Sequence, residues 1–404
     1  MRADGRARVA TCIRLAAMLR SDDRILTTHA GSLPRPAGLV EQLARRSRGE
    51  AVDGATLATA IEDATRDVIA QQRACGIDVG NDGEQGRESF VTYVQDRLSG
   101  FGGRGARPIM RDIVHFPSFL ELKLPQFART AVSLIETPQA IAAVHHADAA
   151  PLARELDAFA RLQAAQTSPF AEAFVTAASP GIIASAMRNA HYDSDTTYVR
   201  AIADAMAPEY AAVAARGLVL QIDCPDLAME RHTAFADRPL ADFIDWVELN
   251  IDALNHALTG VPPAQVRMHV CWGNYEAPHL FDVPLDDILP RLYRARVGGL
   301  VLSLANPRHA HEHTCFARHP LPDDWLLIAG VIDPTTNYVE HPEVVAQRLE
   351  IAARAIGDPH RLLAGTDCGF DTSAGLGTVA HEVVWEKLRS LRDGAAMATQ
   401  RLLT

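Results

Sequence analysis

Short apolar segments recur along this chain, and stretches of helical length lie between most of them. The apolar segments are bounded by turn residues and have the length of buried β-strands. Continuous apolar strands that alternate with amphipathic helices predict a parallel sheet covered by helices. Eight such units favour an α/β protein with a (β/α)8 barrel, also called a TIM barrel. The predicted strands are 25–30, 77–80, 173–178, 218–223, 266–271, 299–304, 326–332 and 361–366, and the main predicted helices are 52–74, 196–216, 239–258, 284–297, 341–357 and 379–394.

Two parts of the chain fall outside this regular alternation. Residues 100–172 separate the second and third predicted strands and are too many for a simple crossover. We expect them to form an inserted helical segment, over the barrel mouth or at a subunit contact. Residues 1–20 carry five arginines and one acidic residue, so we expect a disordered N-terminal extension, with an organellar targeting segment as the alternative. Residues 21–404 are expected to form a single barrel domain.

The composition narrows the class of partner. With 404 residues, of which 48% are hydrophobic and 22% charged, the chain can bury a large core. The formal net charge of -11 argues against nucleic-acid or anionic-membrane binding, since both need a basic surface. No apolar run reaches the length of about 18 residues that a transmembrane helix needs. The six scattered cysteines indicate a reducing compartment, so we expect a cytoplasmic protein.

Polar residues follow several of the predicted strands, at the carboxyl ends where barrel enzymes keep their active sites. His269 and Cys271 in VRMHVCWGN point to the same side of a strand, because side chains alternate along it. Cys368 in RLLAGTDCGF follows the last strand and supplies a third donor. One imidazole and two thiolates suit Zn²⁺, and three protein ligands leave the open position of a catalytic zinc site. Taken alone, the His-x-Cys pair favours a buried histidine and core cysteines over a metal site, and the context of the other strand ends reverses this preference.

Six segments, in this order and spacing, resemble the catalytic half of cobalamin-independent methionine synthase and its shorter single-domain relatives. This family belongs to the superfamily that also contains uroporphyrinogen decarboxylase. The resemblance runs from Arg24 to the C-terminus and implies a (β/α)8 barrel, in agreement with the strand count. The segments are THAGSLPRP (28–36), GIDVGNDGEQGRESF (76–90), LQIDCPDLAM (220–229), HVCWGN (269–274), GVIDPTTNYVE (330–340) and TDCGF (366–370).

The resemblance implies that the histidine and two cysteines named above are zinc ligands. The family has a further glutamate ligand on its sixth strand, and the matching position here is Ser303, which cannot supply an anionic ligand. We expect water to hold the fourth position until substrate arrives, or else another side chain, for which Cys224 and Glu312 are the candidates. Glu312 lies in a histidine-rich tract, 309–313, which a solvated loop explains better than a metal site.

The resemblance also implies a site for an amino-acid substrate. The binding residues of the family match Ser32, Glu84 and Asp223, and His29 and Asn274 lie in the same segments as matched residues. Two carboxylates suit an ammonium group, because each can accept a charge-assisted hydrogen bond. As an alternative, these carboxylates cap strand ends or pair with nearby arginines.

The proton-donating histidine of the family falls at Thr335, in the segment 330–336. A threonine cannot act as a general acid near neutral pH. The leaving amine of a methylated folate must nevertheless be protonated, by water, by a substrate group or by Asp333. Asp333 and Thr335 are therefore the candidate catalytic residues.

These observations predict a zinc-dependent transferase that activates a small thiol as a zinc-bound thiolate and alkylates it. The resemblance implies methyl transfer from methyltetrahydrofolate to homocysteine or a similar thiol, as in methionine biosynthesis. One alternative is a thiol transferase for another electrophile, similar to the epoxyalkane:coenzyme M transferases. Others are a barrel that binds a thiol or zinc without turnover, and a metal-free relative of uroporphyrinogen decarboxylase, against which the thiol-bearing segments argue. All expected ligands are small molecules, and a homo-oligomer is compatible with the sequence.

Overall fold

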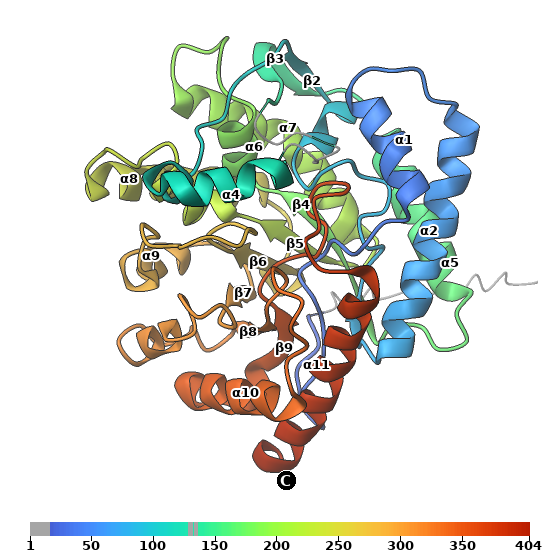
Figure 1. The fold of residues 1–404 in the computed structure, drawn as a ribbon, viewed down its shortest axis with the longest axis vertical. Helices are drawn as coiled ribbons and strands as arrows, with labels where there is room; N and C mark the ends of the chain where they lie inside the picture. Colours follow the sequence, from blue (N-terminus) through green and yellow to red (C-terminus); the bar gives the residue numbers. More distant parts are fainter. Residues whose placement is uncertain (1–16, 128–131, 133–135) are drawn as a thin grey trace, which may run out of the picture.

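Seven parallel strands form the centre of the computed structural model, which describes residues 17–127, 132 and 136–404. The strands span Val79–Gly80 (β1), Glu172–Ala178 (β4), Val219–Asp223 (β5), Val266–Val270 (β6), Gly299–Ser303 (β7), Leu326–Ile332 (β8) and Leu362–Thr366 (β9). They are hydrogen-bonded in the order β1-β4-β5-β6-β7-β8-β9, and each coincides with a strand predicted from the sequence. Helices surround this sheet on its outer side, which gives a TIM-barrel-like fold (Figure 1). The predicted parallel α/β architecture is therefore confirmed.

The segment 25–30 links the two edge strands of the sheet, but it is not a regular strand. Thr27 forms an isolated parallel bridge with Ala364 of β9, and the Val79 N–H of β1 donates to the Thr27 carbonyl at 3.0 Å. The Thr27 N–H donates instead to the carboxylate of Asp78, at 3.0 Å. Because a side chain takes a hydrogen bond that a neighbouring strand would otherwise receive, the first predicted strand is reduced to a single bridge.

The outer helices follow the apolar periodicity of the sequence. They include α1 (Ala37–Ser47), α2 (Gly54–Cys75), α6 (Pro180–Ala186), α7 (Asp195–Ala215), α8 (Leu240–Ala257), α9 (Leu285–Leu292), α10 (Pro342–Ile356) and α11 (His381–Leu402). Short 3-10 helices span Thr92–Asp96, Pro225–Leu227, Met229–His232, Pro263–Gln265, Glu312–Ala317 and Pro359–Arg361. Helices α1 and α6 were not among the main predicted helices, and among those that were, the largest difference is in α11, which continues past Gly394. This glycine lies inside α11, where Val345 of α10 leaves no room for a side chain. It therefore serves close helix packing rather than helix termination.

The stretch between β1 and β4 is only partly helical. It contains α3 (Arg111–His115), α4 (Pro117–Phe127) and α5 (Ala150–Ala164). It also contains β2 (Leu98–Gly102) and β3 (Gln139–His146), which pair antiparallel and which the sequence analysis did not expect. Gly100 and Gly102 disfavour a helix at β2, which explains the difference.

Residues 17–20 are packed against the barrel rather than forming part of a disordered extension. The Met18 N–H donates to the carbonyl of Ala264 at 2.9 Å. The Met18 side chain is buried in an apolar cluster that includes residues of β1, β4, β5, β7, β8 and β9. Residues 1–16 lie outside the described residues. No α-helix in the described part of the chain combines the length and apolarity that crossing a bilayer requires.

Arg267 of β6 forms hydrogen bonds with several segments in the interior of the barrel. Its side chain is almost completely buried, and its guanidinium lies 3.9 Å from the centroid of the Phe174 ring. Its Nε donates to the Gln221 side chain at 2.9 Å, and its two terminal nitrogens donate to the Thr28 hydroxyl and the His29 carbonyl at 3.2 Å each. Burial lowers the pKa of Arg267 to about 10, so the guanidinium stays charged near neutral pH. Arg267 thereby fixes the segment that carries Thr28 and His29.

We expect Arg267→Lys to lower the free energy of unfolding by about 2–4 kcal/mol, because a lysine cannot replace a planar guanidinium that binds three partners. Arg354→Lys on α10 is the control, since 65% of the Arg354 side chain is exposed. This control should change the free energy of unfolding by at most about 0.5 kcal/mol. Urea denaturation of both variants measures the difference, and equal losses would contradict the role given to Arg267.

Candidate metal and substrate site

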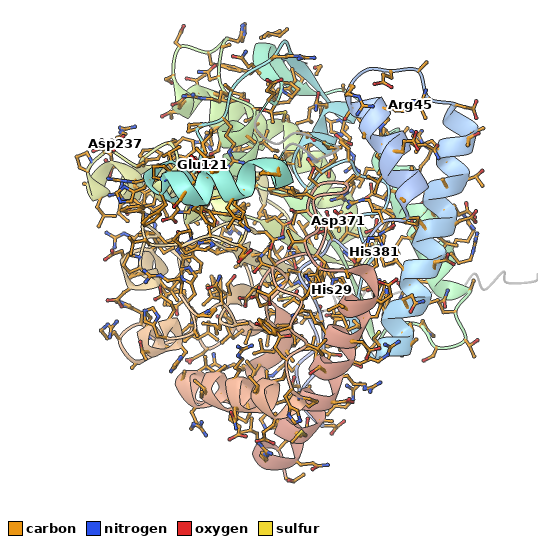
Figure 2. All side chains as sticks on the ribbon, in the orientation of Figure 1. His29, Arg45, Glu121, Asp237, Asp371 and His381 are labelled. Carbon is orange, nitrogen blue, oxygen red and sulfur yellow. The ribbon has the colours of Figure 1, made fainter. Side chains whose placement is uncertain are left out.

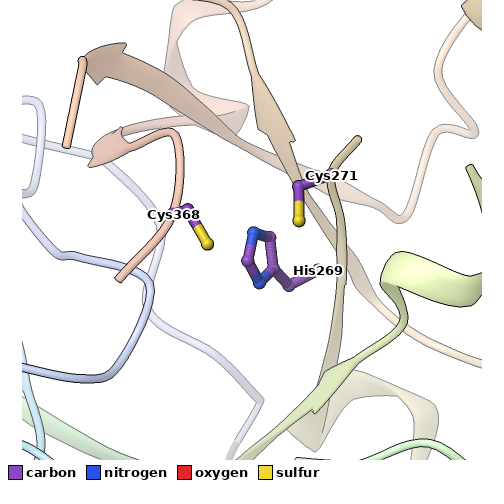
Figure 3. A group of neighbouring side chains, drawn as sticks. All are labelled: His269, Cys271 and Cys368. Carbon is purple, nitrogen blue, oxygen red and sulfur yellow. The ribbon is translucent and has the colours of Figure 1, made fainter. Parts of the chain in front are cut away.

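Three metal-binding side chains meet at the carboxyl ends of two strands. His269 lies in β6, Cys271 follows this strand directly, and Cys368 follows β9. Their ligand atoms lie within 4.8 Å of one another, and all three residues are buried. Figure 3 shows both thiols beside the His269 ring. The spacing of one residue between His269 and Cys271 thus brings both side chains to the same point, as the strand periodicity predicts.

This donor set fits a zinc ion. One imidazole and two thiolates are ligands that Zn²⁺ prefers, and two thiolates balance its charge. The Asp223 carboxylate lies 3.0 Å from His269 Nδ1 and can accept the proton of that nitrogen, whereas Nε2 lies 3.2 Å from the Asp367 carbonyl and would exchange that contact for a metal ion. With three protein ligands, a tetrahedral ion keeps one position for a further ligand.

The electrostatics of the three side chains favour a bound cation. A hydrogen bond from the Cys368 thiol, together with the His269 imidazolium, lowers the pKa of Cys271 well below its usual value. The same contact, together with burial, raises the pKa of Cys368. Burial alone would lower the pKa of His269, but the Cys271 thiolate and Asp223 raise it to about 10. A divalent cation would replace the protons that these groups otherwise share.

The candidates for a fourth ligand differ in their surroundings. Ser303 lines a small cavity together with both thiols, but its hydroxyl donates to the Asp367 carbonyl at 2.9 Å. Cys224 is buried beside the end of β5, and burial raises the pKa of its thiol well above the usual value. Glu312 accepts a hydrogen bond from a backbone N–H at 3.2 Å and lies 3.6 Å from His309. Among the described residues, neither Cys224 nor Glu312 belongs to the group that converges within 4.8 Å.

A cavity of about 660 Å³ opens beside the three ligands. The sequence-predicted residues Ser32, Glu84, Asp223 and Asn274 all line it. Apolar side chains of α3 and α4 also contribute to the wall. The cavity is therefore large enough for an amino acid and a bulkier second molecule.

Glu84 has an unusual backbone conformation in the wall of this cavity. Its φ is 57°, in the left-handed region that residues other than glycine rarely adopt. The Thr176 hydroxyl donates to Oε1 of Glu84 at 3.0 Å, whereas the buried Oε2 has no hydrogen-bond partner. Burial raises the pKa of Glu84 to about 7. An unpaired buried carboxylate of this kind is suited to a cationic ligand.

The two arginines near Glu84 are engaged elsewhere. Arg35 forms an ion pair with Asp371 at 2.9 Å, and Arg87 forms one with Glu155 at 2.6 Å. Arg35 also donates to the backbone carbonyl of Glu84 at 2.8 Å, which holds the backbone rather than the carboxylate. Their ion pairs thus go to other carboxylates, although the charges of both arginines still oppose the rise in the pKa of Glu84.

His29 lies outside the lining of the cavity. Its Nε2 lies 2.8 Å from the side-chain oxygen of Gln72, and its Nδ1 accepts a hydrogen bond from the Gly31 N–H at 3.2 Å. Burial lowers the pKa of His29 to about 4, so the ring is neutral. In Figure 2 it is labelled near the centre of the view, whereas Glu121 lies out on α4. His29 thus supports the turn that carries Ser32, and direct contact with substrate stays a prediction.

Asp333 and Thr335 border the small cavity, which has a volume of about 20 Å³ and also touches Cys271 and Cys368. The Thr335 N–H and hydroxyl both donate to the Asp333 carboxylate, at 2.8 and 2.7 Å. A catalytic role for either residue stays a prediction.

A second group of side chains borders the small cavity, and the sequence analysis did not single out two of its members. Atoms of His279, Asp282 and His309 lie within 4.8 Å of one another, and both histidines line the cavity. His309 and Glu312 are each only 4% exposed, so the expectation of a solvated loop over 309–313 is wrong for these two residues. His309 and Glu312 are three residues apart, which places both on one side of a helical turn. This spacing is a signal in the sequence from which their proximity could have been predicted.

Curated relatives match the chain over almost its whole length. Methionine synthase of Saccharolobus solfataricus is 24% identical over 381 residues, which cover 93% of this chain and 95% of that protein. The 2-hydroxypropyl-CoM lyase of Xanthobacter autotrophicus is 25% identical over 414 residues, which cover 95% of this chain and 98% of that protein. A B12-independent methionine synthase from a Shewanella species, solved with selenomethionine, shares the fold with a TM-score of 0.71 at 22% identity, covering 94% of this chain and 99% of that one. No protein-family model matches the chain.

We expect about one zinc ion per chain, lost almost completely in the Cys271→Ser, Cys368→Ser double variant, because serine removes both thiolate ligands. Cys75→Ser is the control, since the Cys75 thiol is buried elsewhere and contacts the Trp385 carbonyl at 3.5 Å. Elemental analysis by mass spectrometry measures the zinc content. Full zinc content in the double variant would place the metal at another site.

X-ray absorption at the zinc edge should count two sulfur neighbours in the resting protein and three after a thiol is added. The reason is that Ser303 offers no thiolate or carboxylate, so the fourth position stays open to the incoming sulfur. Three sulfur neighbours before any thiol is added would contradict this arrangement and identify Cys224 as a ligand. The Cys224→Ser variant, which should leave the resting count unchanged, provides the control.

Proposed function

We propose that this chain, which is a distant homologue of the cobalamin-independent methionine synthases, is a zinc-dependent transferase that alkylates the sulfur of a small thiol. The observation that carries this proposal is the convergence of His269, Cys271 and Cys368 at the wall of a cavity large enough for two substrates. Methyl transfer from methyltetrahydrofolate to homocysteine is the form of the reaction that the similarity to methionine synthases supports best.

The three ligands set where the reacting sulfur must lie. Zn²⁺, when bound there, would deprotonate an incoming thiol, whose pKa in water is about 8.5, so that it reacts as a thiolate near neutral pH. Asp223 fixes the orientation of the His269 ring through Nδ1, at 3.0 Å. Asp223 also lines the substrate cavity, so one carboxylate serves both the metal ligand and the substrate.

Acceptor atoms in the cavity suit the ammonium group of an amino-acid thiol. Oε2 of Glu84 and Oδ1 of Asn274 are buried without hydrogen-bond partners, and both residues line the cavity. The Asn274 amide nitrogen donates to the Gly369 carbonyl at 2.8 Å, which fixes the orientation of Oδ1. An ammonium group has three donors, and these two acceptors together with Asp223 can receive them.

The apolar wall formed by α3 and α4 would keep water from the reacting sulfur. Ile113, Phe119 and Leu120 are among the side chains that line the cavity from these helices. Exclusion of water would protect the thiolate from solvation. The space without water would also be available to a bulky methyl donor. A methylated folate therefore fits the part of the cavity that the amino-acid thiol does not need.

A thiol transferase for another electrophile is the second candidate, because the 2-hydroxypropyl-CoM lyase matches the chain over almost the whole length of both proteins. Such a thiol would carry a sulfonate rather than an ammonium group. Two cations of the cavity wall, Arg107 and Lys123, pair with Glu230 and Glu276 at 2.7 and 2.6 Å. Little positive charge is thus left for a sulfonate, and the ammonium-binding form is favoured.

Zinc-loaded protein is expected to convert homocysteine and methyltetrahydrofolate to methionine, which mass spectrometry detects. The Cys271→Ser, Cys368→Ser double variant should form no product, because it lacks two of the three ligands. Parallel reactions with an epoxide and a sulfonate thiol test the second candidate. Absence of S-alkylated product with every thiol and donor would leave a binding barrel without turnover.

Glu84→Gln should weaken homocysteine binding by about 1.5–3 kcal/mol, because a charge-assisted hydrogen bond to the ammonium group is lost. The des-amino analogue of homocysteine should bind the wild type and this variant equally. Since the pKa of Glu84 is raised to about 7, homocysteine affinity should also fall as the pH falls through that value and the carboxylate is protonated. Calorimetric titration measures both effects. Equal affinity of the wild type for homocysteine and its des-amino analogue would exclude an α-amino thiol as substrate.

A further inference from the structure

A carboxylate surrounded by three histidines lies beside the small cavity. Oδ2 of Asp282 accepts hydrogen bonds from His279 Nδ1 and His309 Nε2, each at 2.8 Å. Oδ1 of Asp282 lies 2.7 Å from His232 Nδ1. The Asp282 side chain is only 3% exposed, so this carboxylate is shielded from water. These four residues are called the Asp282 cluster below.

The hydrogen bonds of His279 are those of a charged imidazole ring in the Asp282 cluster. Besides Asp282, the ring faces the Tyr275 carbonyl, which lies 3.0 Å from Nε2. Both ring nitrogens therefore face oxygen acceptors, and only an imidazolium has two N–H groups to satisfy them. His279 also has a φ of 51°, and strained backbone of this kind is concentrated at functional sites.

His309 differs from His279, because only one of its two ring nitrogens forms a hydrogen bond. Nε2 donates to Asp282, whereas the buried Nδ1 has no hydrogen-bond partner, and Oε1 of Glu312 lies 3.6 Å from it. The ring stacks on Trp272, the residue after Cys271, with ring centroids 3.9 Å apart. Burial alone would lower the pKa of His309, but the Asp282 and Glu312 carboxylates raise it. His309 is thus held as a charged acid whose Nδ1 proton faces Glu312 at 3.6 Å, longer than a hydrogen bond.

The small cavity connects this acid with the reacting position. His279 and His309 line it on one side, and Cys271 and Cys368 line it as well. Its volume of about 20 Å³ holds about one water molecule. Thr335, which stands where the resemblance places a proton-donating histidine, borders the same cavity.

We infer that His309 is the proton donor of the proposed reaction and that Asp282, His232 and His279 position it. This inference rests on the proposed function. The thiolate sulfur forms a bond to the methyl carbon of an N-methyl donor, the carbon–nitrogen bond breaks, and its electron pair stays on nitrogen. His309 gives its proton to that nitrogen through one water in the small cavity and becomes neutral. The proton that the thiol released restores the imidazolium, so no further reactant is consumed.

The test compares two methyl donors that differ in their leaving group. Methyltetrahydrofolate releases an amine nitrogen that needs a proton, whereas S-methylmethionine releases a neutral thioether that needs none. In single turnovers with homocysteine and zinc-loaded protein, His309→Gln should slow transfer from methyltetrahydrofolate by about 100-fold or more. The same variant should change transfer from the sulfonium by less than about threefold. His311→Gln is the control, since His311 is exposed in the same tract, and it should leave both rates unchanged.

Equal losses with the two donors would show a structural role for His309, and no loss with either donor would exclude any role; both results overturn the inference. Nitrogen-15 NMR of the histidine rings adds a readout that does not depend on turnover. Asp282→Asn should lower the pKa of His309, and an unchanged pKa would overturn the positioning role.

Zinc content distinguishes a proton-donating role of the Asp282 cluster from a metal-binding role. The wild type and His309→Gln should each hold about one zinc ion per chain, because the ligands of the proposed site are unchanged. Two ions in the wild type and one in the variant would make the Asp282 cluster a metal site and overturn the inference. A wild type that methylates homocysteine from neither donor contradicts the proposed function itself, before any variant is compared.

Discussion

The parallel register of β5 and β6 places Asp223 opposite His269, and the rest of the site depends on this pairing. The two side chains lie 3.0 Å apart, so the carboxylate orients the metal-binding ring. The same carboxylate lines the large cavity, where Glu84 completes a pair of acidic groups. The position of the reacting sulfur and the position of the substrate ammonium are therefore set by one backbone register, which leaves little freedom between them.

Much of this site could be predicted from the sequence because it depends on local patterns at strand ends. Apolar runs located all seven strands of the parallel sheet, and a parallel sheet brings their carboxyl ends to one edge. The His-x-Cys spacing then required His269 and Cys271 to share a side, and the last strand had to deliver Cys368 nearby. The carboxylates of Glu84 and Asp223 follow from the same argument, since each lies at or just after a strand.

Other features depend on contacts between distant segments, which a single sequence does not reveal. The Asp282 cluster joins residues 232, 279, 282 and 309, and apart from the three-residue spacing of 279 and 282 no spacing along the chain identifies them as neighbours. The burial of Met18 depends on residues of six strands, so the expectation of disorder does not hold for this residue. Likewise, segment 25–30 has strand-like composition, but the Asp78 side chain takes a hydrogen bond that a strand partner would have received.

Anomalous diffraction at the zinc edge, from crystals of zinc-loaded protein soaked with homocysteine, tests the central claim most directly. The account predicts one zinc peak bound by His269, Cys271 and Cys368, with the thiol sulfur as the fourth ligand and its ammonium group between Glu84 and Asp223. A peak at the Asp282 cluster alone, or homocysteine bound with its sulfur away from the three ligands, would contradict it.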